Sequence, residues 1–477
     1  MHFKAKYEAL DSRNEQFDTA ATAGRVQCPA VKRGVAILVG CMLLASALSE
    51  GAQTASRRRH VSRPVALVWH VETLEGQVTE SNQADDVINP ASVVKVATSL
   101  WALERLGPGF RYETRFLARG TVDEARRVLH GDLVVQGSGD PDFHAENAFL
   151  VAQALNDLHV ERVTGALVVN RLFWIGWENG SAGRDPDPIK RGILMATRLR
   201  QALNPKRWDG LTRMTWREFA MRRRLDPRRP PQVIVAGGVG ADGEVERGEM
   251  LVLHRSQTVA DTLRRFNCYS NNDIERVASN LGPTDEFAAF VAGRCGVARE
   301  AVQFETTSGL GTNRLTPRVI VRLLREFRQT CDRLAVPMES LLPVAGCEPS
   351  TVTHQFPLLA DGPSTASVVG KTGTLTNTDG GVAVLAGVAR TAQGELIFCV
   401  AAPRAAGKLK GSRHAEEKWL LELIEAHGGA QARQCAPELP TPDAGASVIL
   451  LGDRVIPPPD GPPPGATPPS AATPTNK

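Results

Sequence analysis

The stretch Asn89-Pro90-Ala91-Ser92-Val93-Val94-Lys95 decides the fold of this chain. Its proline leads into apolar residues whose spacing predicts a buried helix that starts near Ser92 and ends before Gly107. Ser92 and Lys95 then lie one turn apart on one helix face. A serine hydroxyl is a poor nucleophile at neutral pH, but a partly desolvated lysine with a lowered pKa could remove its proton. The spacing therefore indicates an activated serine.

Two further motifs follow in a fixed order. Ser270-Asn271-Asn272 has the pattern Ser-x-Asn, and Lys371-Thr372-Gly373-Thr374 begins with the only Lys-Thr-Gly of the chain. Ser92 is likewise the only serine that a lysine follows three positions later. Each motif is short, but the three together resemble the signature set of penicillin-binding proteins and serine β-lactamases. We therefore predict a serine acyl-transfer site.

The resemblance extends beyond these motifs. Further matching segments are 89–92, 102–107, 134–141, 308–310 and 315–317. With these, the chain resembles the D-alanyl-D-alanine carboxypeptidase/endopeptidase family, the low-molecular-mass class C penicillin-binding proteins of peptidase family S13, over about residues 63 to 426. The resemblance implies a penicillin-recognising serine transpeptidase/β-lactamase-like fold of the α/β (α+β) class. Such a fold has an antiparallel sheet with helices on both faces, and here an inserted β-rich domain.

The same resemblance implies a role for each motif residue. Ser92 attacks the substrate carbonyl and Lys95 serves as its base. Ser270 passes a proton toward the leaving amine, while Asn272 binds the substrate amide. Lys371 supplies positive potential, which stabilises the developing anion and attracts the terminal carboxylate of the substrate.

The rest of the third motif is expected to bind substrate. Thr372, Gly373 and Thr374 follow Lys371 directly, and the two threonine hydroxyls could donate hydrogen bonds to the terminal carboxylate. The backbone N–H groups of Ser92 and Thr374 would form the oxyanion hole.

One segment departs from the family pattern. The family commonly has Asp-Gly-Ser-Gly-Leu-Ser-Arg, whereas this chain has Thr306-Thr307-Ser308-Gly309-Leu310-Gly311-Thr312. Thr312 stands where the family has arginine, and Arg314 lies two positions later. If the family arginine holds the free carboxylate, its absence puts carboxypeptidase activity in doubt but leaves acylation intact.

The implied function is that of a DD-peptidase acting on peptidoglycan stem peptides, as a carboxypeptidase, an endopeptidase or both. The implied covalent inhibitors are β-lactam antibiotics. Two alternatives stay open. A serine β-lactamase shares the acylation apparatus, although the chain lacks a Glu-x-x-Leu-Asn deacylation segment. A catalytically idle cell-wall-binding protein would share the fold, although the motif residues are intact.

Composition argues against other classes of protein. A net charge of +4 over 477 residues does not indicate a nucleic-acid partner, and no zinc-finger, RNA-binding or basic-zipper pattern occurs. The ten histidines are scattered without metal-ligand spacing, so we expect no metal and no cofactor. The sequence leaves the oligomeric state open.

The motifs fall into two parts of the chain. We expect residues 62–115 and 251–430 to form the peptidase domain, with terminal strands and a helix over 415–426. More chain lies between the first two motifs than this fold requires, so residues 116–250 are expected to form the β-rich insert. Strand-like runs lie at 128–136, 162–170 and 233–236, whereas 189–231 is basic and has no clean period.

Both ends of the chain differ in composition from its middle. Residues 1–47 are read as a leader and signal peptide, because basic residues at 32–33 precede an apolar stretch with a small-residue cleavage site at 45–47. This predicts export to the periplasm. An uncleaved membrane anchor and lipidation at Cys41 are alternatives. Residues 437–477 are rich in proline and are expected to be a disordered tail.

Six cysteines lie beyond the leader. An even number in an exported chain permits disulfides but leaves many pairings open, so no pair is assigned. Cys268 lies two residues before Ser270 and is expected to pack rather than react, because no histidine or metal-ligand spacing accompanies it.

Overall fold

A computed structural model describes residues 65–178, 180, 183, 185–242, 248–450 and 455–456. The predicted leader and signal peptide, and most of the tail after residue 450, lie outside these residues. Within the described ranges, none of the helices combines the length and the apolar character that crossing a membrane would require.

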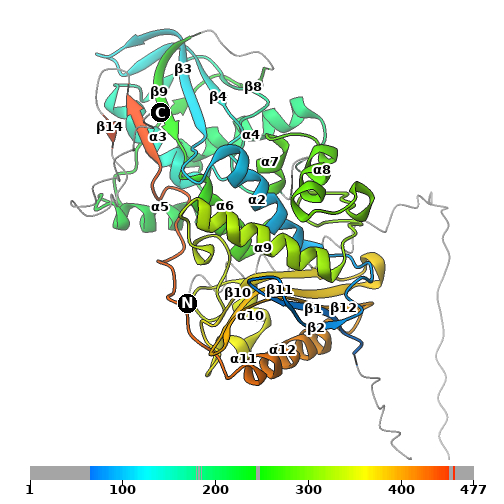
Figure 1. Ribbon diagram of the computed structural model, residues 1–477. Coiled ribbons are helices and arrows are strands. Elements are labelled where there is room, and N and C mark those ends of the chain that lie inside the picture. The colour runs from blue at the N-terminus through cyan, green and yellow to red at the C-terminus, as the bar shows by residue number, and fades with distance from the viewer. Residues whose placement is uncertain are drawn as a thin grey trace, which may run out of the picture. The chain divides into compact units, whose positions relative to one another are not determined.

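An antiparallel sheet of five strands carries the third motif (Figure 1). Its order is β10-β11-β12-β1-β2. Successive side chains of its strands point to opposite faces of the sheet, and both faces contribute apolar residues to hydrophobic cores. Strands that are buried on both faces are apolar along nearly their whole length. β10 is an outer strand, so the Lys-Thr-Gly motif lies at the edge of the sheet. The strands are β1 (Val68–Thr73), β2 (Val78–Asn82), β10 (Val368–Leu375), β11 (Val382–Thr391) and β12 (Gly394–Pro403).

Helices cover both faces of this sheet. Leu420, Leu423 and Ile424 of α12 (Leu409–Ala426) pack with Phe398 and Val400 on one face. The other face packs against the largest hydrophobic core, which includes α2 (Val94–Leu106) and α9 (Pro317–Arg333). This arrangement confirms the predicted fold class.

The helical part surrounds α2, ten residues of which are buried, from Val94 to Leu103. The second motif lies here, between α6 and α7. The remaining helices of this part are α6 (Val259–Tyr269), α7 (Ile274–Ser279), α8 (Thr284–Cys295), α10 (Thr351–Gln355) and α11 (Pro357–Ala360).

A second, mixed sheet of nine strands is built mostly from the predicted insert. Its long central pair, β3 and β4, is antiparallel, whereas the short strands β5 to β8 join in parallel pairs. The runs expected at 128–136, 162–170 and 233–236 contain or overlap β4, β5, β6 and β7. The strands are β3 (Glu113–Asp123), β4 (Val128–Gly137), β5 (Arg162–Val163), β6 (Leu167–Val169), β7 (Ile234–Val235), β8 (Val239–Ala241), β9 (Glu249–Arg255), β13 (Ser447–Leu450) and β14 (Val455–Ile456).

The described part of the insert also contains three α-helices, α3 (Ala145–Asp157), α4 (Pro188–Ala202) and α5 (Gly210–Arg222). The last two occupy the basic stretch in which no period was found. Each begins at an aspartate whose side chain accepts backbone N–H bonds, Asp187 for α4 and Asp209 for α5. The two capping aspartates were sequence signals for the starts of these helices. The many arginines on both helices, however, hid the apolar periodicity that would have predicted them.

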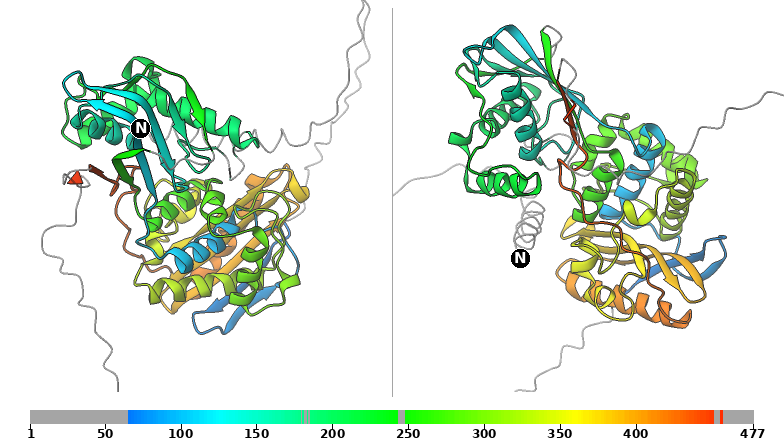
Figure 2. Two further views of the ribbon diagram at one scale, coloured as in Figure 1. Left: turned by 90° about the horizontal axis from the view of Figure 1, so that it is seen from above. Right: turned by 90° about the vertical axis from the view of Figure 1, so that its left-hand side faces the viewer.

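The predicted start of the tail at residue 437 is corrected by the structure. Residues 437–450 form an ordered segment, and β13 pairs antiparallel with β9 of the second sheet. Figure 2 shows this segment running from the end of α12 to that sheet. Buried arginines fix it, since Arg264 and Arg265 donate to the carbonyl oxygens of Pro437 and Pro440. Residues 437–450 are therefore held by hydrogen bonds and strand pairing, although they belong to a stretch rich in proline.

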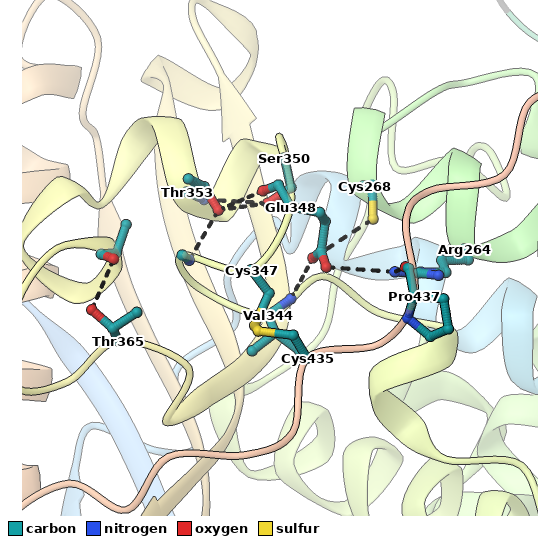
Figure 3. The surroundings of a disulfide bond; sticks show 12 residues. Arg264, Cys268, Val344, Cys347, Glu348, Ser350, Thr353, Thr365, Cys435 and Pro437 are labelled. Atoms are coloured by element: carbon teal, nitrogen blue, oxygen red, sulfur yellow. Dashed lines mark hydrogen bonds and ion pairs between the residues drawn. A yellow bond between two sulfur atoms is a disulfide. The ribbon is translucent and has the colours of Figure 1, made fainter.

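A disulfide between Cys347 and Cys435 anchors the start of this segment (Figure 3). Beside it, Glu348 accepts a hydrogen bond from the backbone N–H of Val344 at 2.7 Å and lies 3.7 Å from Arg264. The remaining cysteines of the described residues are buried and unpaired: Cys268, Cys295, Cys331 and Cys399. Burial raises the pKa of the Cys268 thiol well above its usual value, which disfavours the reactive thiolate.

Candidate active site

The structure brings Ser92 and Lys95 into direct contact. Ser92 lies in a single 3-10 turn, Ala91–Val93, immediately before α2. The Lys95 side chain is fully buried, and its Nζ donates to Ser92 Oγ at 2.8 Å, Asn272 Oδ1 at 2.9 Å and Ser308 O at 2.7 Å. One lysine nitrogen therefore joins the first motif, the second motif and the segment around Ser308.

The electrostatics of this contact favour a neutral Lys95. Burial lowers the pKa of Lys95 to about 7, and the negative charges of Glu275 and Asp273 oppose that shift. A neutral amine has a lone pair that can accept the Ser92 proton. Lys95 could therefore act as a base near neutral pH.

The second and third motifs meet at another lysine. Lys371 Nζ donates to Ser270 Oγ and to its neighbouring carbonyl, Thr372 O, each at 2.9 Å. Ser270 has a left-handed backbone, with φ of 53°, which is uncommon for serine and ends α6 there. Burial lowers the pKa of Lys371 well below its usual value, and the nearby Lys95 charge lowers it further. An anion bound beside Lys371 would favour its charged form.

The threonine hydroxyls of the third motif already have protein partners. Thr372 Oγ1 donates to Thr351 Oγ1 at 2.8 Å, and Thr374 Oγ1 accepts from Arg413 Nη2 at 3.0 Å. Thr374 is the more accessible of the two. The Thr374 and Arg413 pair therefore presents a hydroxyl and a guanidinium together at the end of the motif.

Gly373 has a packing role that the sequence did not reveal. A Cβ on Gly373 would lie 2.5 Å from Pro90 O and 3.1 Å from Ala91 Cβ. Gly309, with φ of +92°, is closer still, because a Cβ there would lie 1.9 Å from Ala91 O. Both glycines let their segments approach the turn that carries Ser92.

The sequence did not predict several hydrogen bonds that position Lys95 and Thr374. Ser308 Oγ donates to Glu275 Oε1, while the Ser308 carbonyl holds Lys95. Ser308 was part of the family resemblance, but a motif does not reveal that its backbone carbonyl accepts a hydrogen bond from Lys95. Arg413 belongs to no motif. Its position beside Thr374 follows from the packing of α12, which the sequence alone does not reveal.

The structure also explains Arg314, the arginine nearest to the altered position Thr312. Arg314 makes two bonds to Asp379, at 2.6 and 3.0 Å, and Asn89 Nδ2 donates to the same carboxylate at 2.7 Å. Arg314 is thus committed to holding the loop after β10. The arginine that contacts the Lys-Thr-Gly strand is Arg413 instead.

Solved structures with the same fold include two predatory endopeptidases and a penicillin-binding protein. The Bd0816 predatory endopeptidase from Bdellovibrio bacteriovorus, solved with the immunity protein Bd3460, is 21% identical with a TM-score of 0.67, covering 79% of this chain and 98% of its own. Penicillin G-acylated Bd3459 endopeptidase from the same organism is 21% identical with a TM-score of 0.66, covering 79% and 97%. Penicillin-binding protein 4 from Haemophilus influenzae is 17% identical with a TM-score of 0.54, covering 75% and 97%.

The family comparison covers most of the chain. Residues 58–188 and 231–420 match the model of one peptidase family, and the unmatched stretch between them holds most of α4 and all of α5. The matched ranges include all three motifs and the loop around Ser308. The chain belongs to the D-Ala-D-Ala carboxypeptidase 3 (S13) family.

Proposed function

We propose that this protein is an exported serine DD-peptidase that cleaves the bond after a penultimate D-alanine in peptidoglycan stem peptides. The observation that carries the proposal is the Lys95 nitrogen, which is buried and bonded at once to Ser92, Asn272 and Ser308. A buried lysine in contact with an accessible serine is the arrangement that acyl transfer needs. Family membership supplies the expected substrate class.

The proposed acylation step follows from the two lysines. Neutral Lys95 accepts the proton of Ser92 Oγ as that oxygen attacks the substrate carbonyl carbon. The C–N bond of the tetrahedral intermediate then breaks, and the leaving amine receives a proton through Ser270, which is bonded to Lys371. Water hydrolyses the resulting ester and restores Ser92. The backbone N–H groups of Ser92 and Thr374 remain the proposed oxyanion hole.

Both activities of the family are compatible with the proposed site. Arg413 supplies a cation and Thr374 a hydroxyl for a terminal carboxylate, which would also favour the charged form of Lys371, and this supports carboxypeptidase activity. Similarity in fold to two predatory endopeptidases supports cleavage of crosslinked peptides as well. The penicillin G adduct of one of them supports acylation of this chain by β-lactams.

The proposed location is the periplasm. Family members that act on peptidoglycan must be exported, and the sequence offers a signal near residues 32–47. The Cys347–Cys435 disulfide supports this proposal, because disulfides persist in oxidising compartments and are rare in the cytosol.

The test compares two substrates with purified protein that lacks residues 1–47. We expect release of D-alanine from a pentapeptide and cleavage of a crosslinked muropeptide, both abolished in Ser92→Ala. Cleavage of only the crosslinked substrate would restrict the proposal to an endopeptidase. Cleavage of neither, together with rapid hydrolysis of penicillin, would replace it with a β-lactamase.

A further inference from the structure

A short segment, residues 343–351, lies along the outer edge of β10, and we call it the edge segment. Backbone hydrogen bonds join it to the strand just before the Lys-Thr-Gly motif. The bonded pairs are Gly370 N–H with Pro343 O at 3.0 Å and Ala345 N–H with Val368 O at 2.9 Å. The motif begins directly after Gly370, so the edge segment is paired with the strand up to the residue that precedes it.

The edge segment also contacts the motif through a side chain. Thr372 Oγ1 donates to Thr351 Oγ1 at 2.8 Å, and both threonines are buried. Lys371 lies between this contact and the backbone pairing, and its Nζ donates to Ser270 Oγ. The position of the Lys371 amine therefore depends on a strand that is bonded to the edge segment on both sides of this lysine.

Hydrogen bonds within the edge segment and α10 fold it into a turn (Figure 3). Glu348 accepts the backbone N–H of Val344 at 2.7 Å. Thr353 Oγ1 donates to Glu348 O at 2.9 Å and accepts from the Gly346 N–H at 3.2 Å. These bonds give the turn its shape, but they join the turn only to itself.

The Cys347–Cys435 disulfide ties this turn to a well-anchored part of the chain. Arg433 lies two residues before Cys435, and its side chain is only 4% exposed. It pairs with Glu339 at 2.6 Å and with Glu395 at 2.7 Å. The disulfide therefore fixes the edge segment, and through it the outer edge of β10, to a buried set of ion pairs.

The disulfide lies where a thiol in solution can reach it. Cys435 is an exposed residue and Cys347 is partly exposed. The other cysteines of the described residues are buried and unpaired. Among these residues, a reductant therefore acts on one bond, and that bond is linked to the active site through the edge segment.

We propose that the Cys347–Cys435 disulfide is a redox switch for acylation at Ser92, acting through the edge segment on β10. This inference rests on the proposed function and adds its regulation. The reductant is a dithiol, either a small molecule or a dithiol oxidoreductase. Its thiolate attacks Cys435 Sγ, the S–S bond breaks, and Cys347 leaves as a thiolate that takes up a proton. The second thiol of the reductant then attacks the mixed disulfide, so that Cys435 is released as a thiol and the reductant becomes a disulfide.

Reduction removes the covalent tie but none of the hydrogen bonds to β10. The edge segment then opens locally at a lower free energy, because fewer constraints oppose its separation from the strand. Lys371 and Thr372 follow the strand, and a displacement of reacting groups by 1 Å can lower a rate by ~10²-fold. The oxidised form is therefore the more active form, and reduction lowers the rate without removing any motif residue.

The experiment measures the rate constant for acylation by fluorescent penicillin in oxidised protein and after treatment with dithiothreitol, at a temperature well below both melting points. We expect about a tenfold lower rate in the reduced protein, less than the limit for a displacement of 1 Å. Oxidation with diamide should restore the rate. The double variant Cys347→Ser with Cys435→Ser is the control, since its rate should be low and should not respond to dithiothreitol. A wild-type rate that does not change on reduction would refute the switch.

Amide hydrogen exchange separates a local effect from a general loss of stability. After reduction, peptides that cover 343–351 and 368–372 should exchange faster, whereas peptides from β1 and β12 should exchange as before. Equal acceleration in all of these strands would assign the lower rate to general destabilisation and would overturn the proposal.

The oxidised protein tests the proposed function separately. If it labels on Ser92 and reduction leaves the rate unchanged, the peptidase assignment stands and the switch is wrong. If the oxidised protein does not label, both the acyl-transfer function and its regulation are refuted.

Discussion

Lys95 and Lys371 are both fully buried in one site, and burial, together with the nearby charge of Lys95, lowers the pKa of Lys371. Two like charges in a site of low dielectric disfavour each other, so the two amines do not favour being charged at the same time. Lys95 is hydrogen-bonded to Ser92 and Lys371 to Ser270, so each lysine is paired with a different serine. Lys95 is the group suited to accept a proton, and Lys371 the group suited to face an anion.

The first prediction concerns pH. The pKa of Lys95 is lowered to about 7, so the neutral base is the minor form below that value and the major form above it. The rate constant for acylation by penicillin should therefore rise as pH increases through about 7. Lys95→Arg stays protonated and should lose at least ~10²-fold in rate at every pH. A wild-type profile that is flat from pH 5 to 8 would contradict this role for Lys95.

The second prediction concerns Glu275, whose charge raises the pKa of Lys95. Glu275→Gln removes that charge but keeps an oxygen that can accept from Ser308 Oγ. The midpoint of the acylation profile should move to lower pH. Glu300→Gln, an exposed change of the same type, is the control and should leave the midpoint in place. A shift to higher pH would mean that Glu275 does not act through its charge.

The sequence predicts this fold well where all residues of a pattern lie within one helix or strand. Ser92 and Lys95 are three residues apart, and the strands of the five-stranded sheet read as apolar runs between turns. It fails where partners are distant, as for Lys95 and Ser308, which are separated by 213 positions. Arg413 beside Thr374 and β13 beside β9 likewise depend on packing that no local pattern encodes.

The third prediction assigns Arg413 to carboxylate binding. Its guanidinium already contacts Thr374 Oγ1, so it can share a terminal carboxylate with Lys371. Arg413→Gln should reduce kcat/KM on a pentapeptide by about tenfold, which corresponds to roughly 1.4 kcal/mol of transition-state stabilisation. A peptide with an amidated terminus should be affected less. Lys410→Gln, an exposed change on the same helix, serves as the control. Equal losses on both peptides would instead assign Arg413 a structural role.

The fourth prediction concerns the segment that follows α12. Cys347 and Cys435 close a loop of 88 positions, a length for which a disulfide contributes roughly 4 kcal/mol to the free energy of unfolding. Cys435→Ser should therefore lower the melting temperature, and dithiothreitol should lower that of the wild type only. A chain that ends after residue 456 should melt like the full protein, whereas one that ends after 434 should not. Equal melting of the two truncated chains would mean that 437–450 adds no stability.

The most direct test of the account is to locate the covalent adduct. Purified protein is mixed with fluorescent penicillin, digested, and analysed by mass spectrometry at increasing times. The account predicts one labelled peptide, with the adduct on Ser92, that persists long after free penicillin is removed. A label on another residue, a label that survives Ser92→Ala, or no label at all would contradict serine acyl transfer at this site.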